Sequence, residues 1–178
     1  MALPEDFDLD EFISRVLDED LGKGGDVTSN ATIAADARFT AEMNSRQEIV
    51  VAGLEIAAAF FRKLDPSIQI EQPANDGDRV GVGAVLMRLT GNARAMLTAE
   101  RSALNTLQHL SGIAALTRQY VDAIAGTGAV LIDTRKTIPG LRLLEKYAVR
   151  MGGAENHRMR LDDGVLIKDN HVAVCGGV

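Results

Sequence analysis

Two short apolar runs in the last third of the chain constrain its fold more than any other feature. Val130-Leu131-Ile132 and Val165-Leu166-Ile167 contain only branched aliphatic side chains, and the second run begins 35 residues after the first. Such runs are typical of strands that are buried on both faces. A helical pattern over residues 141–151 lies between them and ends at Gly152-Gly153. Strand, helix and strand at this spacing predict a βαβ unit of a parallel sheet or barrel.

Each apolar run ends abruptly in polar residues. Asp133-Thr134-Arg135-Lys136 follows the first run and Lys168-Asp169-Asn170-His171 follows the second, while His157-Arg158 lies between them. In α/β barrels the active site lies at the C-terminal ends of the strands. Arginine binds a carboxylate through two parallel hydrogen bonds, and lysine suits a phosphate as a point charge. The sequence therefore predicts a site for substrates that carry carboxylates and phosphates.

The charge distribution excludes one class of partner. The net charge is −6, which argues against nucleic acid because binding to it usually rests on a basic surface. Residues 1–36 carry most of the acidic excess, whereas residues 133–171 are locally basic. Within that basic segment Arg142, Lys146 and Arg150 are spaced four apart, and we expect them to form a solvated helix face.

Membrane and secretory classes are also disfavoured. No apolar run approaches the roughly 18 residues that a membrane span needs. Residues 1–11 are acidic and lack the basic start and apolar core of a secretory signal. Cys175 is the single cysteine, so no disulfide can form within the chain. We therefore expect a protein of the reducing cytoplasm without a membrane partner.

Residues 1–125 form a region with a different pattern, and we place the boundary to the βαβ region, residues 126–178, at this point. Gly112 is expected to break or kink the long helix of this region, because glycine costs about 1 kcal/mol relative to alanine inside a helix. The expected elements are helices over residues 10–21, 54–64 and 96–125, strands over 39–43 and 48–52, an all-β stretch over 68–90, and a turn-rich loop over 23–32.

The all-β stretch resembles the hairpin of biotinyl and lipoyl carrier domains. Asp76-Gly77-Asp78 predicts its tight turn, and Val80, Val82 and Val85 supply apolar strand positions. Carrier domains need an exposed lysine at the tip of a hairpin. No lysine occurs between Lys63 and Lys136, so a carrier function is excluded here.

Five motifs in order give a specific resemblance to a known family. The motifs are Glu19-Asp20 with Gly25-Asp26-Val27-Thr28; Glu100-Arg101-Ser102-Ala103-Leu104-Asn105 with Leu110-Ser111-Gly112-Ile113-Ala114; Asp133-Thr134-Arg135-Lys136-Thr137-Ile138-Pro139-Gly140; Gly152-Gly153 with Asn156-His157-Arg158; and Ile167-Lys168-Asp169-Asn170-His171. Together they extend over essentially the whole chain. The sequence thereby resembles the quinolinate phosphoribosyltransferases.

The resemblance implies both a fold and a reaction. The fold is an N-terminal α/β sandwich domain, here residues 1–125 with the long connecting helix, followed by the first part of an incomplete α/β (TIM-like) barrel, here residues 126–178. The reaction converts quinolinate and phosphoribosyl pyrophosphate into nicotinate mononucleotide, pyrophosphate and carbon dioxide with Mg²⁺, as a step of NAD biosynthesis. The family forms a homodimer in which the partner's N-terminal domain caps the barrel mouth.

The resemblance also assigns roles to particular residues. Arg135, His157 and Arg158 would hold the two carboxylates of quinolinate, and Arg101 would reach in from the neighbouring subunit. Lys136 and Lys168, the expected catalytic pair, would face the phosphates. The complete set of substrate-binding candidates is Arg101, Thr134, Arg135, Lys136, His157, Arg158 and Lys168, with Arg160 and His171 as secondary candidates.

The chain departs from the family pattern in its length. Only 49 residues follow Ala129, fewer than two repeats of about 35 residues, whereas a closed barrel needs on the order of 200 residues. We therefore expect a fragment, a truncated product or an incomplete sequence, with little turnover of its own. The family's metal-binding acids are expected on later strands. Local alternatives are Asp133, Asp162, Asp163 and Asp169.

Three other functions stay open at this point. A lysine at the end of a barrel strand, such as Lys168, also suits a Schiff-base aldolase, which borohydride trapping would reveal. A relative of the family that is associated with molybdenum transport shares many of the motifs. A non-catalytic remnant that only binds anions and dimerises is the third alternative, and binding and turnover assays would separate it from an enzyme.

Overall fold

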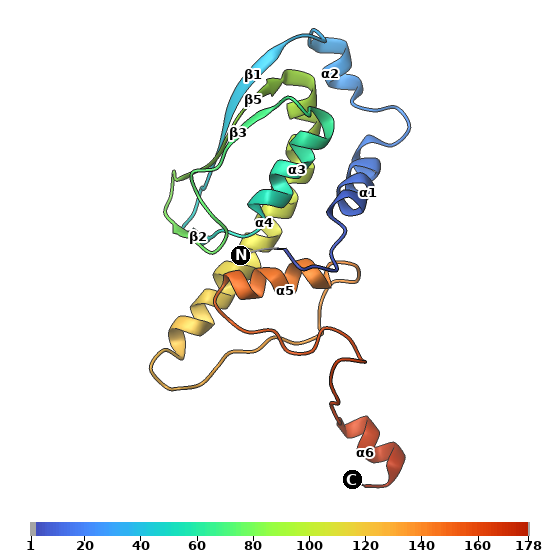
Figure 1. Cartoon of the computed structure of the whole chain (residues 1–178), viewed down its shortest axis with the longest axis vertical. Helices are drawn as coiled ribbons and strands as arrows, with labels where there is room; N and C mark the ends of the chain where they lie inside the picture. Colours follow the sequence, from blue (N-terminus) through green and yellow to red (C-terminus); the bar gives the residue numbers. More distant parts are fainter. Residues whose placement is uncertain (1–2, 178) are drawn as a thin grey trace.

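The 31-residue helix α4 (Ala93–Ala123) runs through the molecule, and most other elements pack along it in this computed structural model, which describes residues 3–177 (Figure 1). The Asn92 side chain accepts a hydrogen bond from the backbone N–H of Ala95 and so caps its start. The predicted break at Gly112 is wrong, because the helix continues through this residue. Its neighbours Leu110, Ser111 and Ala114 are buried, and this packing offsets the low helix propensity of glycine.

The N-terminal half is a two-layer α/β arrangement. A three-stranded antiparallel sheet has the order β1 (Arg38–Asn44), β5 (Val85–Asn92) and β3 (Gln69–Glu71). It lies to one side of α4 and of α3 (Leu54–Leu64), which begins and ends where the sequence predicts (Figure 1). Helix α1 (Leu9–Leu21) covers the opposite side of these helices and ends at Gly22, as expected.

The predicted hairpin is confirmed in part, because the turn at Asp76-Gly77-Asp78 is present and β3 pairs antiparallel with β5, but the strand directly after the turn belongs to another sheet. Strand β4 (Arg79–Val80) pairs with β2 (Ile49–Val50) instead of continuing into a hairpin with β5. The reason is that the turn docks onto the start of α3. The Asp76 carboxylate accepts hydrogen bonds from the backbone N–H groups of Gly53 (2.8 Å) and Leu54 (3.0 Å). It thereby caps a helix whose own N-cap residue is a glycine.

The loop expected over residues 23–32 contains a short helix, α2 (Val27–Thr32). Asp26 caps it, because its carboxylate accepts hydrogen bonds from the backbone N–H (2.9 Å) and the hydroxyl (2.5 Å) of Ser29. Arg94 of α4 then donates to the carbonyl oxygen of Ile33, directly after the helix. A short polar segment thus becomes helical through capping and tertiary contacts that composition alone does not reveal.

The C-terminal part contains two helices that differ in their surroundings. Helix α5 (Arg142–Met151) packs against the second half of α4 and buries Leu144, Tyr147, Ala148 and Met151. Helix α6 (Asp169–Cys175) has no buried residue and stands apart from the rest of the molecule (Figure 1). Neither of them, nor any other helix within residues 3–177, is long and apolar enough to cross a bilayer.

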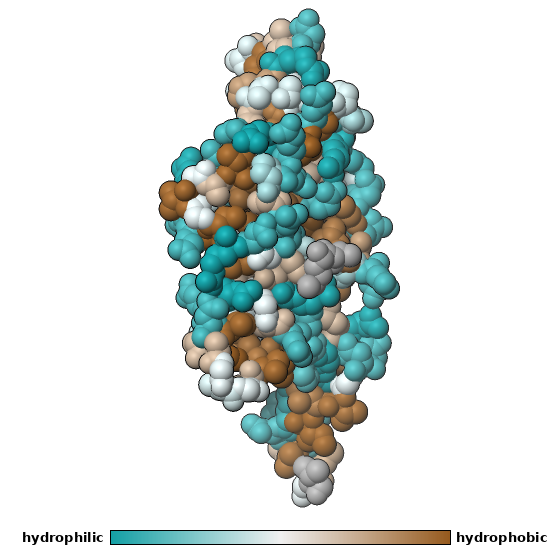
Figure 2. Space-filling view, turned by 60° about the vertical axis from the view of Figure 1, so that its left-hand side comes forward, coloured by the Kyte–Doolittle hydropathy of each residue, from teal (hydrophilic) through white to brown (hydrophobic). Residues whose placement is uncertain are grey.

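The two apolar runs do not form strands buried on both faces, so that prediction is wrong for this chain. Ile132 makes a single parallel bridge with Glu155, supported by backbone hydrogen bonds from Asp133 to Glu155 and from Glu155 to Leu131. Val130 is 61% exposed and Val165 94% exposed. Within residues 3–177 the runs find no neighbouring strand for a continuous ladder. Apolar side chains accordingly gather at the lower end of the molecule (Figure 2).

Helix α5 can approach α4 closely only because Gly152 has no side chain. A Cβ atom at this position would lie 2.4 Å from Cβ of Thr117 and 2.6 Å from the carbonyl oxygen of Ala114. We predict that Gly152→Ala lowers the free energy of unfolding by about 1–3 kcal/mol, the usual cost of overpacking. Gly112→Ala is the matched control, since its Cβ would meet no atom within 4 Å. The control should raise stability by up to about 1 kcal/mol in urea denaturation, and equal effects of both changes would contradict this packing.

Asp65 ties the end of α3 to the end of β5 and should make stability depend on acid pH. The hydrogen bond from the backbone N–H of Asn92 to this buried carboxylate, followed by those from Ser67, lowers its pKa below the ordinary 3.8. A lowered pKa stabilises the folded state above 3.8, and this contribution is lost as the pH falls through the folded-state pKa. Urea denaturation between pH 7 and pH 2.5 should show a smaller acid-induced loss in Asp65→Asn than in the wild type. Parallel pH curves for the two proteins would refute it.

Candidate anion-binding site

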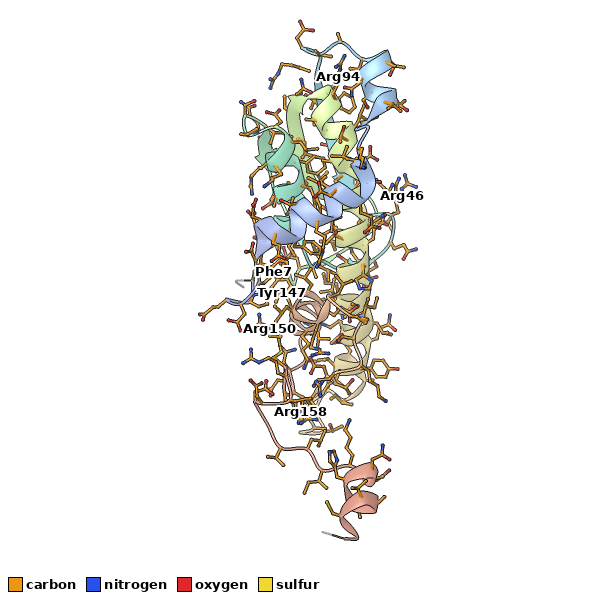
Figure 3. The ribbon with its side chains drawn as sticks, turned by 90° about the vertical axis from the view of Figure 1, so that its right-hand side faces the viewer. Phe7, Arg46, Arg94, Tyr147, Arg150 and Arg158 are labelled. Atoms are coloured by element: carbon orange, nitrogen blue, oxygen red, sulfur yellow. The ribbon has the colours of Figure 1, made fainter. Side chains whose placement is uncertain are left out.

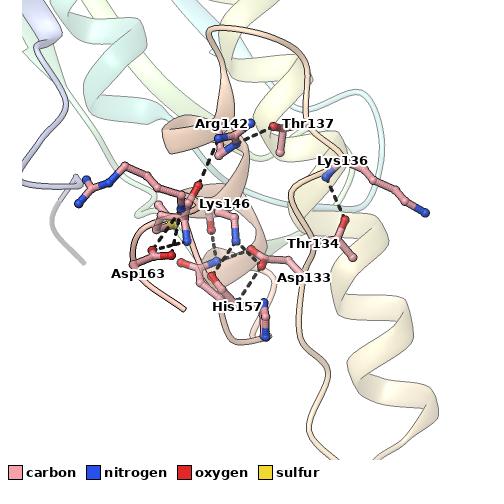
Figure 4. A network of polar contacts seen from close by, with 11 residues as sticks. Asp133, Thr134, Lys136, Thr137, Arg142, Lys146, His157 and Asp163 are labelled. Carbon is pink, nitrogen blue, oxygen red and sulfur yellow. Dashed lines mark hydrogen bonds and ion pairs between the residues drawn. The ribbon is translucent and has the colours of Figure 1, made fainter. Parts of the chain in front are cut away.

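The carboxylate of Asp133 joins two loops that are far apart in the sequence. Its Oδ1 atom accepts hydrogen bonds from Nζ of Lys146 (2.5 Å) and from the backbone N–H of His157 (2.8 Å). Its Oδ2 atom accepts one from Nδ2 of Asn156 (2.7 Å). These contacts bring the loop of residues 133–136 beside the loop of residues 156–158 (Figure 4). The side chain of Asp133 is only 8% exposed, so the junction is shielded from water.

Lys146 does not lie on a solvated helix face, and the prediction for it is wrong. Its side chain is 1% exposed, and Nζ also donates to the carbonyl oxygen of His157 (2.8 Å). Arg142 is half-buried and donates to the hydroxyl of Thr137 and to the carbonyl oxygen of Met159. The guanidinium of Arg150 lies over the ring of Tyr147. Cations that are spaced four residues apart lie on one face of a helix. The spacing does not show whether that face is exposed to solvent or buried against the rest of the chain.

Among the predicted residues of the first loop, Arg135 has the most suggestive environment. The exposed hydroxyl of Thr134 accepts a hydrogen bond from the backbone N–H of Lys136 (3.1 Å). The side chain of Lys136 is also exposed and extends away from Asp133 (Figure 4). Arg135 is half-buried, and its Nε atom is buried without a hydrogen-bond partner. A buried, unsatisfied donor is costly and is usually explained by a missing partner. An anion bound at this loop would supply one.

The second loop supplies His157 and Arg158, both half-buried. Arg158 donates one hydrogen bond, from Nη1 to the carbonyl oxygen of Gly164 (2.7 Å). The side chains of Arg135, Lys136 and Arg158 set the charge of the two loops, because Asp133 is neutralised by Lys146. The contacts of Asp133 thus join the loop that contains Thr134, Arg135 and Lys136 to the loop that contains His157 and Arg158, while the side chain of Lys136 extends away from the junction.

The secondary candidates make no contact with the junction at Asp133 among the contacts of the described residues. The guanidinium of Arg160 is exposed and pairs with Asp162 (3.0 Å) and Asp6 (3.4 Å), and its hydrogen bond with Asp162 raises its pKa further. His171 accepts a hydrogen bond from the backbone N–H of Lys168 at the start of α6. Lys168 is itself exposed there. It directly precedes α6, which stands apart from the rest of the molecule (Figure 1).

Arg101 also lies away from the two loops. It is exposed on α4, eight residues before His109, which contacts Glu145 of α5. Eight residues correspond to about 12 Å along a helix axis. Arg101 lines a groove of about 680 Å³ between α4 and the sheet, together with Arg46, Gln47, Glu100 and Gln108. Figure 3 shows Arg46 well separated from Arg158 along the long axis of the molecule.

The local carboxylates are not arranged as a metal site. Within residues 3–177 no three His, Cys, Asp or Glu side chains converge as metal ligands would. Asp133 is occupied by the contacts above, and Asp162 pairs with Arg160. Burial raises the pKa of Asp163, but hydrogen bonds from the backbone N–H groups of Met159 and Arg160 outweigh it, and the net pKa is lowered. Asp169 is exposed in the first turn of α6.

Two family models match the chain. The model of the quinolinate phosphoribosyl transferase N-terminal domain matches residues 26–111, and that of its C-terminal domain matches residues 113–178. The chain belongs to the quinolinate phosphoribosyltransferase family. The two matches meet at Gly112, in the middle of α4, so this helix is shared between both parts of the family fold.

Curated relatives and solved structures agree with this family. The chain is 45% identical over 97% of its length to quinolinate phosphoribosyltransferase (decarboxylating) 2, mitochondrial, of Nicotiana glauca, and covers 48% of that protein. It is also 45% identical over 99% of its length to a probable nicotinate-nucleotide pyrophosphorylase (carboxylating) of Synechocystis, of which it covers 59%. The structure of NadC from Streptococcus pyogenes superimposes with a TM-score of 0.94 at 39% identity, covering 100% of this chain and 63% of that one.

A second solved structure gives the same result. Nicotinate-nucleotide pyrophosphorylase from Ehrlichia chaffeensis matches with a TM-score of 0.92 at 42% identity, covering 97% of this chain and 63% of that chain. The predicted family and fold class, an N-terminal α/β domain followed by part of an α/β barrel, are therefore confirmed. The chain spans about half the length of the plant relatives that it matches.

The sequence interpretation missed the polar residues that hold the site together. Lys146 and Arg142 were expected on a solvated helix face. Glu145 was not among the predicted site residues, although its carboxylate accepts a hydrogen bond from the backbone N–H of Ile138 (3.2 Å). All three lie on α5, between the two loops in sequence. A signal was present in the neighbouring apolar residues Leu144, Tyr147 and Ala148, which indicate that much of the helix circumference is buried.

Proposed function

We propose that this chain provides the quinolinate-binding part of a quinolinate phosphoribosyltransferase, which forms nicotinate mononucleotide, pyrophosphate and carbon dioxide from quinolinate and phosphoribosyl pyrophosphate. The observation that supports the proposal is the junction at Asp133, which joins the loop that contains Arg135 to the loop that contains His157 and Arg158. The buried, unpartnered Nε of Arg135 supports it from the same loop. The names of the matching relatives agree with this reaction.

The two loops suit a substrate with two adjacent carboxylates. Arg135 would bind one carboxylate through its planar guanidinium, and Arg158 with His157 would bind the other. The loops are joined at Asp133, so their cations are held in place before the substrate arrives. Binding groups that are already positioned lose little conformational entropy when the ligand binds. A dianion is therefore favoured over a monoanion of the same ring.

Lys136 and Lys168 would contact the phosphates of phosphoribosyl pyrophosphate. In the reaction the bond between C1 of the ribose and the pyrophosphate oxygen breaks, and the ring nitrogen of quinolinate forms a bond to C1. Cations near the leaving group stabilise its developing negative charge. The resulting pyridinium draws electrons from the carbon that carries the adjacent carboxylate. Carbon dioxide leaves, its bonding electrons stay on the ring carbon, and a proton from solvent completes the product.

Mg²⁺ is expected to accompany the pyrophosphate group, since magnesium commonly binds through substrate phosphates and one or two carboxylates. The part of the chain that the structure describes offers no cluster of acidic ligands for it. No step above therefore depends on a metal held by these residues. We place the reaction in the cytoplasm, a reducing compartment that suits the exposed Cys175.

The family alternatives are less well supported. The matching relatives are named for quinolinate or nicotinate-nucleotide chemistry, which disfavours a molybdenum-associated role. A Schiff-base lysine is activated by an apolar pocket or a neighbouring cation, whereas Lys168 is exposed directly before helix α6. A non-catalytic remnant would bind quinolinate without turnover, so a turnover assay on a preparation of known mass separates this alternative from the enzyme.

Arg135→Lys tests the carboxylate contact directly. Lysine keeps the charge but loses the two parallel hydrogen bonds, so quinolinate binding should weaken by about 1–3 kcal/mol in calorimetry. Arg62→Lys is the matched control, because Arg62 is exposed on α3 and pairs with Glu55. The control should bind quinolinate like the wild type. An unchanged dissociation constant in Arg135→Lys would rule out the assigned role.

A subunit-mixing experiment tests whether Arg101 serves the site of a two-fold partner, as we propose for a homodimer. In a preparation that turns over quinolinate, Arg101→Ala and Arg135→Ala homodimers should each be nearly inactive. After joint unfolding and refolding, half of the dimers are mixed, and each mixed dimer has one site with both changes and one with neither. About a quarter of all sites should then be active under two-fold symmetry. If Arg101 acted within its own subunit, no activity would return.

A further inference from the structure

Three polar residues of α5 hold the loop that carries Arg135. Lys146 donates to the carboxylate of Asp133 at the start of this loop (2.5 Å), and Arg142 donates to the hydroxyl of Thr137 (3.1 Å). Glu145 accepts from the backbone N–H of Ile138 (3.2 Å). These contacts fix both ends of the loop while leaving Arg135 and Lys136 between them. One helix therefore determines where the first set of cations lies.

The same helix holds the loop that carries His157 and Arg158. Lys146 donates to the carbonyl oxygen of His157 (2.8 Å), and its own carbonyl oxygen accepts from Nδ2 of Asn156 (2.9 Å). Arg142 donates to the carbonyl oxygen of Met159 (3.2 Å). Lys146 is thus bonded to both loops through one ammonium group. It acts beside the direct hydrogen bonds that Asp133 accepts from the backbone N–H of His157 and from Asn156.

The burial of Lys146 has a cost that hydrophobic packing would avoid. Its side chain is 1% exposed, and removing an ammonium and a carboxylate from water costs several kcal/mol per ion before their attraction is counted. A well-packed apolar pair is often at least as stable as a buried ion pair. An apolar side chain, however, could not bind a carbonyl oxygen and a carboxylate in fixed directions. The geometry points to orientation of the loops as the role of this lysine.

We propose that Lys146 is a positioning residue that sets the spacing between Arg135 and the His157–Arg158 pair, and thereby the preference for two adjacent carboxylates. The proposed preference for two carboxylates rests on the function proposed above. The proposed positioning of the loops by Lys146 does not depend on that function. A ligand with two carboxylates must reach both loops at once. A ligand with one carboxylate needs only one loop, so its binding should depend little on the spacing between them.

The test for positioning uses amide hydrogen exchange on the 178-residue chain. Lys146→Met keeps an unbranched side chain of similar length but cannot donate. Exchange of the His157 amide, which bonds to Asp133, should become at least about tenfold faster, while amides in the buried part of α3 should exchange as in the wild type. Lys63→Met is the control, since Lys63 makes an exposed ion pair with Asp10 (2.6 Å). It should leave exchange at His157 unchanged.

Lys146→Met leaves the carboxylate of Asp133 without its counter-ion and could prevent folding. The double variant Asp133→Asn with Lys146→Met removes both charges and is the second arm of the test. The carbonyl oxygen of His157 still loses its donor in this protein. Its His157 amide should therefore also exchange faster than in the wild type. Wild-type protection of His157 in a folded variant that lacks Lys146 would overturn the positioning role.

The test for selectivity compares quinolinate with nicotinate, which has the same ring and one carboxylate fewer. In Lys146→Met, or in the double variant, quinolinate affinity should fall by about tenfold, while nicotinate affinity should change by less than about twofold. If Lys146 had a purely structural role, the ratio of quinolinate affinity to nicotinate affinity would stay unchanged below the melting temperature. That result would overturn the proposed role of Lys146 in selectivity. If the wild type binds neither acid, the proposed function and the selectivity both fail, whereas hydrogen exchange still decides whether Lys146 positions the loops.

Discussion

Close packing against α4 is the constraint on which the rest of the structure depends. The start of α3 meets α4 at Gly53, where a Cβ atom would lie 2.8 Å from Cδ1 of Leu110. The end of α5 meets it at Gly152, beside Thr117. Ser111 adds a buried hydrogen bond to the backbone N–H of Ala52 (3.1 Å). Because these contacts follow one another along a single helix, the sheet domain and α5 are fixed relative to each other.

Fixing α5 in this way also fixes the candidate site. The apolar side of α5 is buried against α4, and its polar side chains reach outward to the two cationic loops. Tyr147 extends this connection, because its hydroxyl donates to Asp76, which also caps α3. Burial, followed by the hydrogen bond with Asp76, raises the pKa of Tyr147, so its hydroxyl keeps its proton further into the alkaline range than an ordinary tyrosine does. The loops thus depend on packing that begins in the N-terminal domain.

The sequence predicts local structure well where the cause is local. Helix α3 begins and ends at its predicted residues because apolar periodicity and the Asp65-Pro66 stop lie within the segment itself. Helix α2 was missed because Asp26 and Arg94 stabilise it through a cap and a distant contact. The part of the hairpin directly after the turn was wrong, since β4 pairs with β2 where Asp76 binds the start of α3. Distant contacts, made by Arg94 and by Asp76, take part in both errors, and the Asp26 cap adds a local contribution to the first.

The same distinction applies to the site. The polar residues after Ile132 and the Asn156-His157-Arg158 motif could be selected from the sequence, and the structure brings them together. Charge spacing could not show that Lys146 is buried, since the same spacing describes a solvated face. The apolar runs predicted strands, but a strand also needs a neighbour for its backbone hydrogen bonds. Sequence patterns therefore identify candidate site residues, but they do not identify the residues that hold those candidates in place.

The structure divides the proposed substrate contacts into two groups with different degrees of preorganisation. Arg135, His157 and Arg158 belong to loops that α5 holds through side-chain and backbone hydrogen bonds. Lys168 lies at the start of α6, next to the largely exposed Val165-Leu166-Ile167 segment. A charge on such a segment can be attracted to a phosphate but cannot impose a geometry on it, because holding a group in place requires packing around it. The carboxylate side of the proposed site is therefore the part that these residues build by themselves.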